Sequence, residues 1–211
     1  MSFIEAQNYG PVSNAVIYGL HESIARAKYS MCTDANIENI YLTKGIEKIA
    51  QGAPGTGHDQ WLTGVVAQFD LTFSNKAWVE AERYHFLDFV SSQSTMHKIT
   101  QFDLDKAYNK YVDNGIITIM KRKVDEYNKL AEEFKNSNVV DDSLRNRIND
   151  LYLEILYSNP AGFILTAGMT TNYRQLKTIY LQRKTHRLPE WREFCHWIEL
   201  LPYGYLITNK I

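Results

Sequence analysis

One short segment with strand-like alternation interrupts a chain whose other apolar residues recur at helical spacing. Between residues 65 and 73, Phe69, Leu71 and Phe73 fall on one side of the alternation and polar residues fall on the other. A period of two predicts a half-buried strand. Because segments with a helical period precede and follow it, the sequence predicts a helix-rich α+β fold.

Capping signals delimit the predicted helices. A side-chain oxygen can cap the first turn of a helix at Ser13, at Asp141 or Asp142, and at Thr171 or Asn172. Pro189 suits the first turn of the last helix. Residues 163–170 are predicted to be extended. Predicted helices span residues 14–31, 37–50, 75–89, 103–112, 116–136, 143–157, 172–184 and the segment that begins at Pro189.

The composition is that of a globular chain, with 211 residues, 45% of them hydrophobic, and a formal net charge of −1. A chain this long buries about 70% of its unfolded surface, so we expect a single domain, 1–211, without a structural metal. The balanced charge argues against nucleic acid or a membrane as partner. No apolar run approaches the about 18 residues of a membrane span, and the first nine residues do not resemble a signal peptide. We therefore expect a cytoplasmic location.

Most signatures of catalysis are missing from the sequence. It has no glycine-rich dinucleotide fingerprint, no phosphate-binding loop and no nucleophile elbow, and the run from Gly52 to Gly57 predicts a plain turn. His58 and Asp59 form a candidate metal pair, but no second histidine stands at ligand spacing, which disfavours a metal hydrolase. Cys32 and Cys195 are expected to be reduced thiols, because they lie far apart with no other cysteine nearby.

A first candidate binding segment covers residues 82–98, where cationic, aromatic and hydroxyl side chains occur together. Such a mixture suits a flat, anionic ligand: arginine meets phosphate, serine and glutamine satisfy base edges, and aromatic rings stack. The alternative is an amphipathic helix followed by a polar surface loop. The candidate binding residues in this segment are Arg83, His85, Ser91, Ser92, Gln93 and Ser94.

A second candidate segment covers residues 170–187. Its capped helix start offers free N–H groups and the positive end of the helix dipole to an anion. Arg183 lies eleven residues after Asn172, about three turns, so the two share a face near opposite helix ends. Lys184, His186 and Arg187 add positive charge to the last turn, where they also simply complement the carbonyl end of the dipole.

At these residues the chain resembles the flavin-dependent thymidylate synthase family, as a diverged member. The family opens a helix with Thr-x-Asn-x-Arg and has a functional arginine eleven residues after the asparagine, as Asn172, Arg174 and Arg183 do here. Arg-Tyr-His at 83–85 falls where the family has Arg-His-Arg, so His85 replaces an arginine. Gly-His-Asp at 57–59 is similar to the family's Gly-His-Glu. The order of elements matches from about Ser13 to Ile198.

The resemblance implies a helix-rich fold with a small, mostly antiparallel sheet, and a homotetramer that binds FAD between subunits. It implies one-carbon transfer from methylene-tetrahydrofolate to dUMP, with NADPH as the reductant. It assigns Arg183 to the uracil carbonyl as the catalytic residue. The implied cofactor-binding residues are His58, Arg83, His85, Asn172 and Arg187, and the implied substrate-binding residues are Ser91, Ser92, Gln93, Ser94 and Arg174.

Two functions fit the sequence. The first is an FAD-dependent, nucleotide-modifying enzyme of this type. The alternative is a catalytically inactive relative of the same fold that acts as a nucleotide-binding or accessory protein, such as a virus would encode.

Overall fold

The computed structural model describes residues 3–35, 41–137 and 141–209. The chain forms two compact units, the first made of residues 1–73, 77–91 and 166–211, the second of residues 74–76 and 92–165. We describe each unit by itself. The expectation of a single domain over 1–211 stays a prediction.

The first unit contains nearly all of a five-stranded sheet whose strand order is β1-β2-β3-β5-β4. Strand β2 pairs antiparallel with both β1 and β3, and its register with β3 shifts between Ser13 and Val16. This small sheet in a helix-rich chain confirms the predicted fold class. The strands are β1 (Phe3–Glu5), β2 (Val12–Tyr18), β3 (Val66–Ser74), β4 (Asp88–Ser92) and β5 (Ile164–Asn172).

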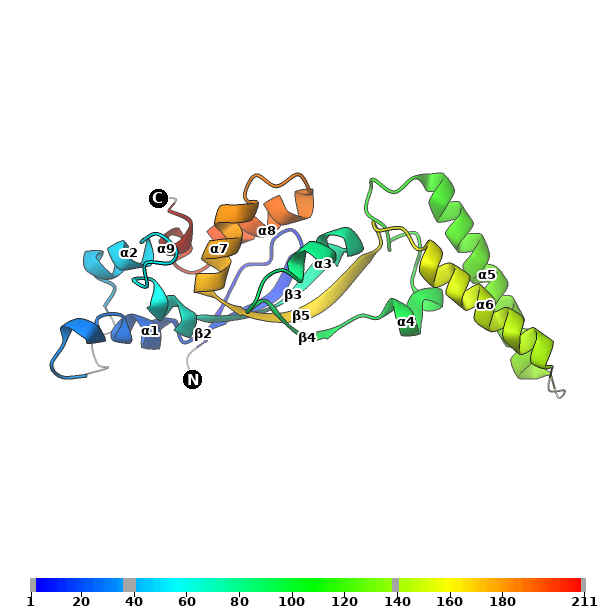
Figure 1. Ribbon diagram of the computed structural model, residues 1–211, viewed down its shortest axis with the longest axis horizontal. Coiled ribbons are helices and arrows are strands. Elements are labelled where there is room, and N and C mark those ends of the chain that lie inside the picture. The colour runs from blue at the N-terminus through cyan, green and yellow to red at the C-terminus, as the bar shows by residue number, and fades with distance from the viewer. Residues whose placement is uncertain (1–2, 36–40, 138–140, 210–211) are drawn as a thin grey trace. The chain divides into compact units, whose positions relative to one another are not determined.

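Aromatic packing joins the sheet to the helices that Figure 1 shows on one of its sides. The ring of Phe73 on β3 lies 4.9 Å from that of Trp191 on α8 (Pro189–Glu199), and Phe69 lies 4.8 Å from Trp197. Helix α7 (Tyr173–Arg183) packs beside α8 and α9 (Tyr205–Thr208). Burial of these rings fixes α7, which continues directly from β5.

The remaining elements of the first unit lead the chain into β3 and out of it. They are α1 (Leu20–Arg26), α2 (Lys44–Ala50), α3 (Asn75–Ala81) and the 3₁₀ helices η1 (Tyr29–Met31) and η2 (Gln60–Gly64). The backbone N–H of Tyr173 donates to the Val65 carbonyl at 3.0 Å, so the end of η2 lies beside the start of α7. An added Cβ at Gly19, whose φ is 70°, would come within 2.5 Å of the Gly64 carbonyl oxygen, so α1 also begins against η2.

The second unit is built around an antiparallel helix pair (Figure 1). Its elements are α4 (Thr95–Lys98), the 3₁₀ helix η3 (Ile99–Gln101), α5 (Asn114–Asn136) and α6 (Asp142–Ser158). Met120, Val124, Leu151 and Ile155 are buried between the helices, and their charged faces are exposed. Among the described residues of both units, no helix is long and apolar enough to cross a membrane.

The predicted helix over residues 14–31 is wrong in its first part, which forms β2. Val12, Ala15 and Ile17 are buried while Asn14 is exposed, because the register shift adds one residue to the alternation. Asn14 and Gly19 have φ values of 53° and 70°, and the left-handed backbone at Gly19 separates β2 from α1. The spacing of the apolar residues fits a helix as well as a strand, and pairing with β3 selects the strand.

The predicted helix over residues 103–112 is also wrong. The side chains of Asp103 and Asn109 accept hydrogen bonds from the backbone N–H groups two residues later, at 3.1 and 3.0 Å. These local bonds compete with helical ones. The helix predicted to extend from residue 75 toward 89 ends at Ala81, and β4 occupies residues 88–92. Of the predicted helix 37–50, residues 37–40 lie outside the described residues, and the helix begins at Lys44.

The other predicted elements are confirmed within a few residues. The strand expected at 65–73 is β3, and the extended segment expected at 163–170 is β5. Asp141 caps α6 by accepting from the Leu144 N–H at 3.0 Å, and Pro189 opens α8. Residues 52–57 form turns, with Gly55 and Gly57 at positive φ.

Candidate functional site

The junction of β5 and α7 carries the side chains that the sequence analysis selected in its second segment. Asn172 ends β5 in extended conformation, and its side-chain oxygen accepts from the Gln175 N–H at 2.9 Å, which caps α7. One residue earlier, Thr171 donates its hydroxyl to the Phe86 carbonyl at 2.6 Å. This bond brings residue 86 of the first candidate segment to the start of α7.

A cavity of about 350 Å³, which we call the α7 cavity, opens at this helix start. It combines residues from the 52–59 turn, from η2 and from the first two turns of α7. Asn172 and Arg174, both predicted from sequence, lie on its wall. The full lining is Pro54, Gly55, Asp59, Gln60, Thr63, Phe86, Asn172, Arg174, Gln175 and Thr178.

Asp59, Arg174 and Lys177 form an ion triad at the wall of the α7 cavity. Asp59 is buried, and its two carboxylate oxygens accept from different cations: Oδ1 from Arg174 Nε at 3.1 Å, and Oδ2 from Lys177 Nζ at 2.9 Å. Lys177 is fully buried and also donates to the carbonyls of Ala50, at 2.7 Å, and Gly52. Two cations face one carboxylate, so the triad carries a net charge of +1 beside the positive end of the α7 dipole.

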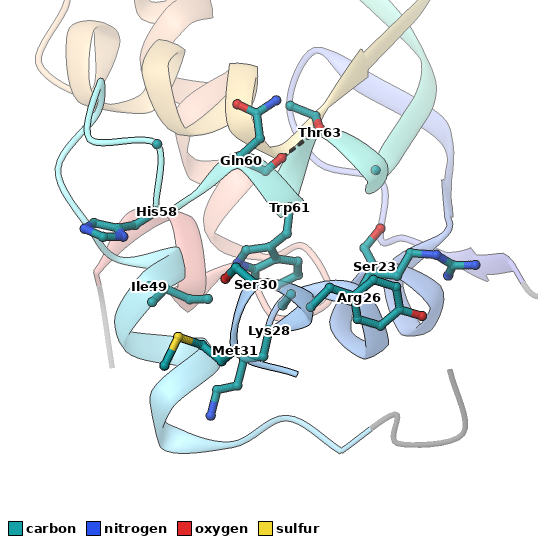
Figure 2. A pocket seen from close by; sticks show the side chains of 14 residues that line it. Ser23, Arg26, Lys28, Ser30, Met31, Ile49, His58, Gln60, Trp61 and Thr63 are labelled. Carbon is teal, nitrogen blue, oxygen red and sulfur yellow. Dashed lines mark hydrogen bonds between the residues drawn. The ribbon is translucent and has the colours of Figure 1, made fainter. Parts of the chain in front are cut away.

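A second cavity, of about 780 Å³, lies on the other side of η2, and we call it the Trp61 cavity. Figure 2 shows the Trp61 indole in its centre, with Ser23 and Arg26 on one side and His58 and Ile49 on the other. The two cavities share Gln60 and Thr63 of η2. The Trp61 cavity is lined by Ser23, Arg26, Ala27, Lys28, Tyr29, Ser30, Met31, Ile49, Gly57, His58, Gln60, Trp61, Thr63 and Gly64.

The lining of the Trp61 cavity favours an anion with a flat ring. It includes no aspartate or glutamate. In the part of the chain that the structure describes, no carboxylate forms an ion pair with Arg26, Lys28 or His58. The indole Nε1 of Trp61 is buried and has no hydrogen-bond partner there, which leaves a donor for a ligand. His58, predicted as a cofactor ligand, is exposed at this cavity and not at the α7 cavity.

The far end of α7 carries the arginine predicted to be catalytic. Arg183 donates from Nε to the Tyr84 hydroxyl at 2.6 Å and from Nη1 to Glu80 Oε2 at 3.0 Å. Its guanidinium carbon lies 5.0 Å from the centre of the Trp191 ring, a cation–π distance. His186 Nε2 lies 3.1 Å from Glu80 Oε2, and its Nδ1 accepts from the Leu188 N–H at 3.2 Å.

Tyr84 connects the two candidate segments. Burial raises its pKa, and the hydrogen bond from Arg183 opposes that rise without cancelling it. The neutral phenol therefore accepts from Arg183 and donates to Gln182 Oε1 at 3.0 Å. The segments around residues 83 and 183 are thus in contact, but the contact is made by Tyr84 and not by Arg83.

The other predicted site residues lie at the surface. Arg83, His85 and Arg187 are exposed and line neither cavity. Ser91 is an exposed residue of the edge strand β4. Ser92, Gln93 and Ser94 belong to the second unit, so they are not placed relative to α7.

Sequence reasoning missed the ionic partners of both arginines. Asp59 was considered as half of a metal pair and as part of the Gly-His-Asp segment, but not as an ionic partner, and Lys177, Glu80 and Tyr84 were not singled out. One signal was available: Lys177 interrupts the buried stripe of α7, where Leu176, Ile179 and Tyr180 surround it. A lysine on such a face needs a buried partner. Within the described ranges no three His, Cys, Asp or Glu side chains gather as a metal site.

No protein-family model matches the sequence, and no curated protein matches it. The structure, however, matches crystal structures of the flavin-dependent thymidylate synthase ThyX from Helicobacter pylori complexed with FAD and dUMP. Two such structures give TM-scores of 0.62 and 0.61 at 15% identity, over 99% of this chain and 97% of that chain. The chain has the flavin-dependent thymidylate synthase fold. This confirms the fold that the resemblance implied.

Proposed function

We propose that the protein is an FAD-dependent enzyme that modifies a nucleotide, of the flavin-dependent thymidylate synthase type. It would transfer a one-carbon unit from methylene-tetrahydrofolate to dUMP, with NADPH as the reductant. The observation that carries the proposal is the pair of cavities that share η2, with Arg174 on the wall of one and Arg26 and Lys28 on the wall of the other. They occur in a fold whose compared structures, from Helicobacter pylori, hold FAD and dUMP.

The residues around η2 fit a flavin dinucleotide. Asn172 and His58 would bind the cofactor from the α7 cavity and the Trp61 cavity, which share η2 as their common wall. Among the residues that the structure describes, Trp61 offers a flat ring and an N–H without a hydrogen-bond partner, and Arg26 and Lys28 have no carboxylate as an ion-pair partner. FAD, when bound, supplies the hydride chemistry that no side chain can perform.

Arg174 would bind a phosphate group of the nucleotide. Its Nε is held by Asp59, and its side chain is 33% exposed at the α7 cavity. An arginine whose two terminal nitrogens point at a phosphate can make two parallel charge-assisted hydrogen bonds. Ser91, Ser92, Gln93 and Ser94 are proposed to complete nucleotide binding with hydroxyl and amide groups.

Arg183 would donate a hydrogen bond to the uracil carbonyl. Nε and Nη1 are engaged by Tyr84 and Glu80, which fixes the plane of the guanidinium group. Because Glu80 offsets its charge, Arg183 suits a neutral carbonyl that gains negative charge during the reaction. A donor fixed before the reaction stabilises such a charge without reorganising.

A homotetramer would complete the site. Arg83, His85 and Arg187 are exposed, and as cofactor-binding residues they need a neighbouring surface to enclose the ligand. Light scattering of the purified protein tests this directly. A mass of four chains is expected, and a monomer mass would contradict a site shared between subunits.

The decisive experiment for the proposed function is reconstitution with FAD. The purified protein should be yellow, or should become yellow after incubation with FAD and gel filtration. It should then oxidise NADPH and form dTMP from dUMP and methylene-tetrahydrofolate. A colourless protein that retains no FAD would reject the proposal.

An inactive, nucleotide-binding relative is the second candidate. The observation that favours it is the environment of Arg183, where Glu80 and Tyr84 already occupy two of the three nitrogens. Calorimetric titration with dUMP distinguishes the two functions. Saturable dUMP binding without FAD retention or turnover would support the inactive relative.

A further inference from the structure

Lys177 cannot contact a ligand itself. An ammonium group has three N–H donors, and those of Lys177 go to the Ala50 carbonyl, the Gly52 carbonyl and Asp59. Its side chain is 2% exposed. Whatever Lys177 does at the α7 cavity, it does through the groups that it holds.

Arg174 shows the opposite situation. Its Nε donates to Asp59, and in the described ranges its two terminal nitrogens have no hydrogen bond or ion pair. The side chain lies on the wall of the α7 cavity, where 33% of it is exposed. The one bond at Nε therefore restricts the guanidinium group and leaves its outer edge for a ligand.

Lys177 and Arg174 have different electrostatic roles in the triad. Burying a carboxylate is unfavourable unless a positive charge compensates it, and the buried ammonium group of Lys177 compensates the charge of Asp59. Arg174 can then leave or keep its own hydrogen bond without leaving Asp59 uncompensated. A free arginine side chain loses rotamer entropy when a ligand fixes it, and here the hydrogen bond to Asp59 restricts the side chain before a ligand arrives.

We propose that Asp59 is a positioning residue that aims the terminal nitrogens of Arg174 at a phosphate group, with Lys177 as its buried counter-ion. The inference rests on the proposed function for the source of that phosphate, which is FAD or the nucleotide. It predicts that the effect of the Asp59–Lys177 pair on phosphate binding passes entirely through Arg174.

The test is a double-mutant cycle. Asp59→Asn alone would leave Lys177 buried without a partner, so the first arm is the pair Asp59→Asn/Lys177→Met, which removes both charges and leaves the net charge unchanged. The second arm is Arg174→Ala, and the third combines them. The control, Lys123→Met/Glu154→Gln, removes an ion pair of 2.7 Å from the helix pair of the second unit.

Dissociation constants are measured for FAD, for dUMP and for inorganic pyrophosphate by calorimetry, with circular dichroism on every variant. The double substitution Asp59→Asn/Lys177→Met should raise the dissociation constant of the phosphate ligand that contacts Arg174 by about tenfold. In the Arg174→Ala background it should cause no further change. Equal weakening in both backgrounds would mean that the pair acts only by packing, and an unchanged dissociation constant would also overturn the proposal.

The three probes separate this inference from the proposed function. If pyrophosphate binding follows the cycle but FAD does not bind, the positioning role stands and the flavin function fails. If FAD binds but the arms are additive for every probe, the positioning role fails and the flavin function stands. Absence of any Arg174-dependent binding overturns the positioning role outright.

Discussion

The two ends of α7 hold their arginines in opposite electrostatic states. At the N-terminal end, Arg174 and Lys177 share the single carboxylate of Asp59, which leaves one positive charge uncompensated. At the C-terminal end, Arg183 forms an ion pair with the carboxylate of Glu80, so one positive charge faces one negative charge. One helix thus carries an unbalanced cationic end and a balanced one.

This difference in charge balance indicates which kind of ligand group each end of α7 can bind. A surplus positive charge at a helix start attracts a ligand that is already an anion, such as a phosphate. A balanced arginine, fixed by Glu80 and Tyr84, suits an oxygen that becomes negative only during a reaction. The proposed roles of Arg174 and Arg183 follow from this difference, and substitutions at both ends of α7 can test them.

Asp59→Asn should lower the stability of the protein more than any substitution at the other end of α7. It leaves the fully buried Lys177 without a counter-charge, and breaking a buried ion pair in this way costs about 3–5 kcal/mol. Urea unfolding followed by circular dichroism measures the loss. Glu80→Gln at the other end should cost less, about 1–3 kcal/mol. Equal losses at both ends would contradict the assigned charge balance.

Arg183→Ala should affect turnover more than binding. Loss of a fixed donor to a developing negative charge lowers kcat about 100- to 1000-fold. We expect this in dTMP formation by the FAD-loaded enzyme, with little change in the dissociation constant of dUMP. An unchanged kcat would remove Arg183 from the reaction.

Arg174→Ala should affect binding more than turnover. Loss of charge-assisted hydrogen bonds costs about 1.5–3 kcal/mol, or roughly 10- to 100-fold in the dissociation constant of the phosphate ligand. The remaining binding should also depend less on salt. Arg145→Ala on the exposed face of α6 removes the same charge and serves as the control. If both variants weaken binding equally, only the net charge matters.

Two substitutions of Asn172 separate the cap from the ligand. Asn172→Ala removes the acceptor for the Gln175 N–H and should cost about 1 kcal/mol of stability. Asn172→Asp keeps the cap, so stability should be retained, but its negative charge should weaken binding of FAD. Thermal unfolding and FAD titration measure the two effects. Equal FAD affinity in Asn172→Asp and the unchanged protein would place the flavin elsewhere.

Cys195, which lies near Arg183 at the C-terminal end of α7, should resist alkylation. Burial raises the pKa of Cys195 to about 12, Glu199 acts in the same direction, and the charges of Arg183 and Lys184 oppose the rise without cancelling it. A thiol with a raised pKa stays protonated and unreactive well above pH 7. At pH 8, iodoacetamide should modify the exposed Cys32 and leave Cys195 intact, as mass spectrometry can show. Rapid labelling of Cys195 in the folded protein would contradict its burial.

Local signals predicted the elements that flank the site. The alternation of Phe69, Leu71 and Phe73 predicted β3, and the capping residue Asn172 predicted the start of α7. The segment at 14–18 failed because its apolar spacing fits a helix as well as a strand, and β3 supplies the pairing that decides. The segment at 103–112 failed because side-chain bonds to nearby backbone groups replaced helical ones.

The amino-acid sequence alone was enough to predict that α7 begins at a capped residue, Asn172, and carries Arg183 about three turns later, because capping and helical period act within a few residues. The tertiary structure was needed to show which arginine has its positive charge compensated by a carboxylate. Asp59 lies 118 positions before Lys177, and Glu80 lies 103 before Arg183. Their pairing follows from the packing of η2 and α3 around α7, since the charge that an arginine presents depends on which carboxylate the fold brings beside it.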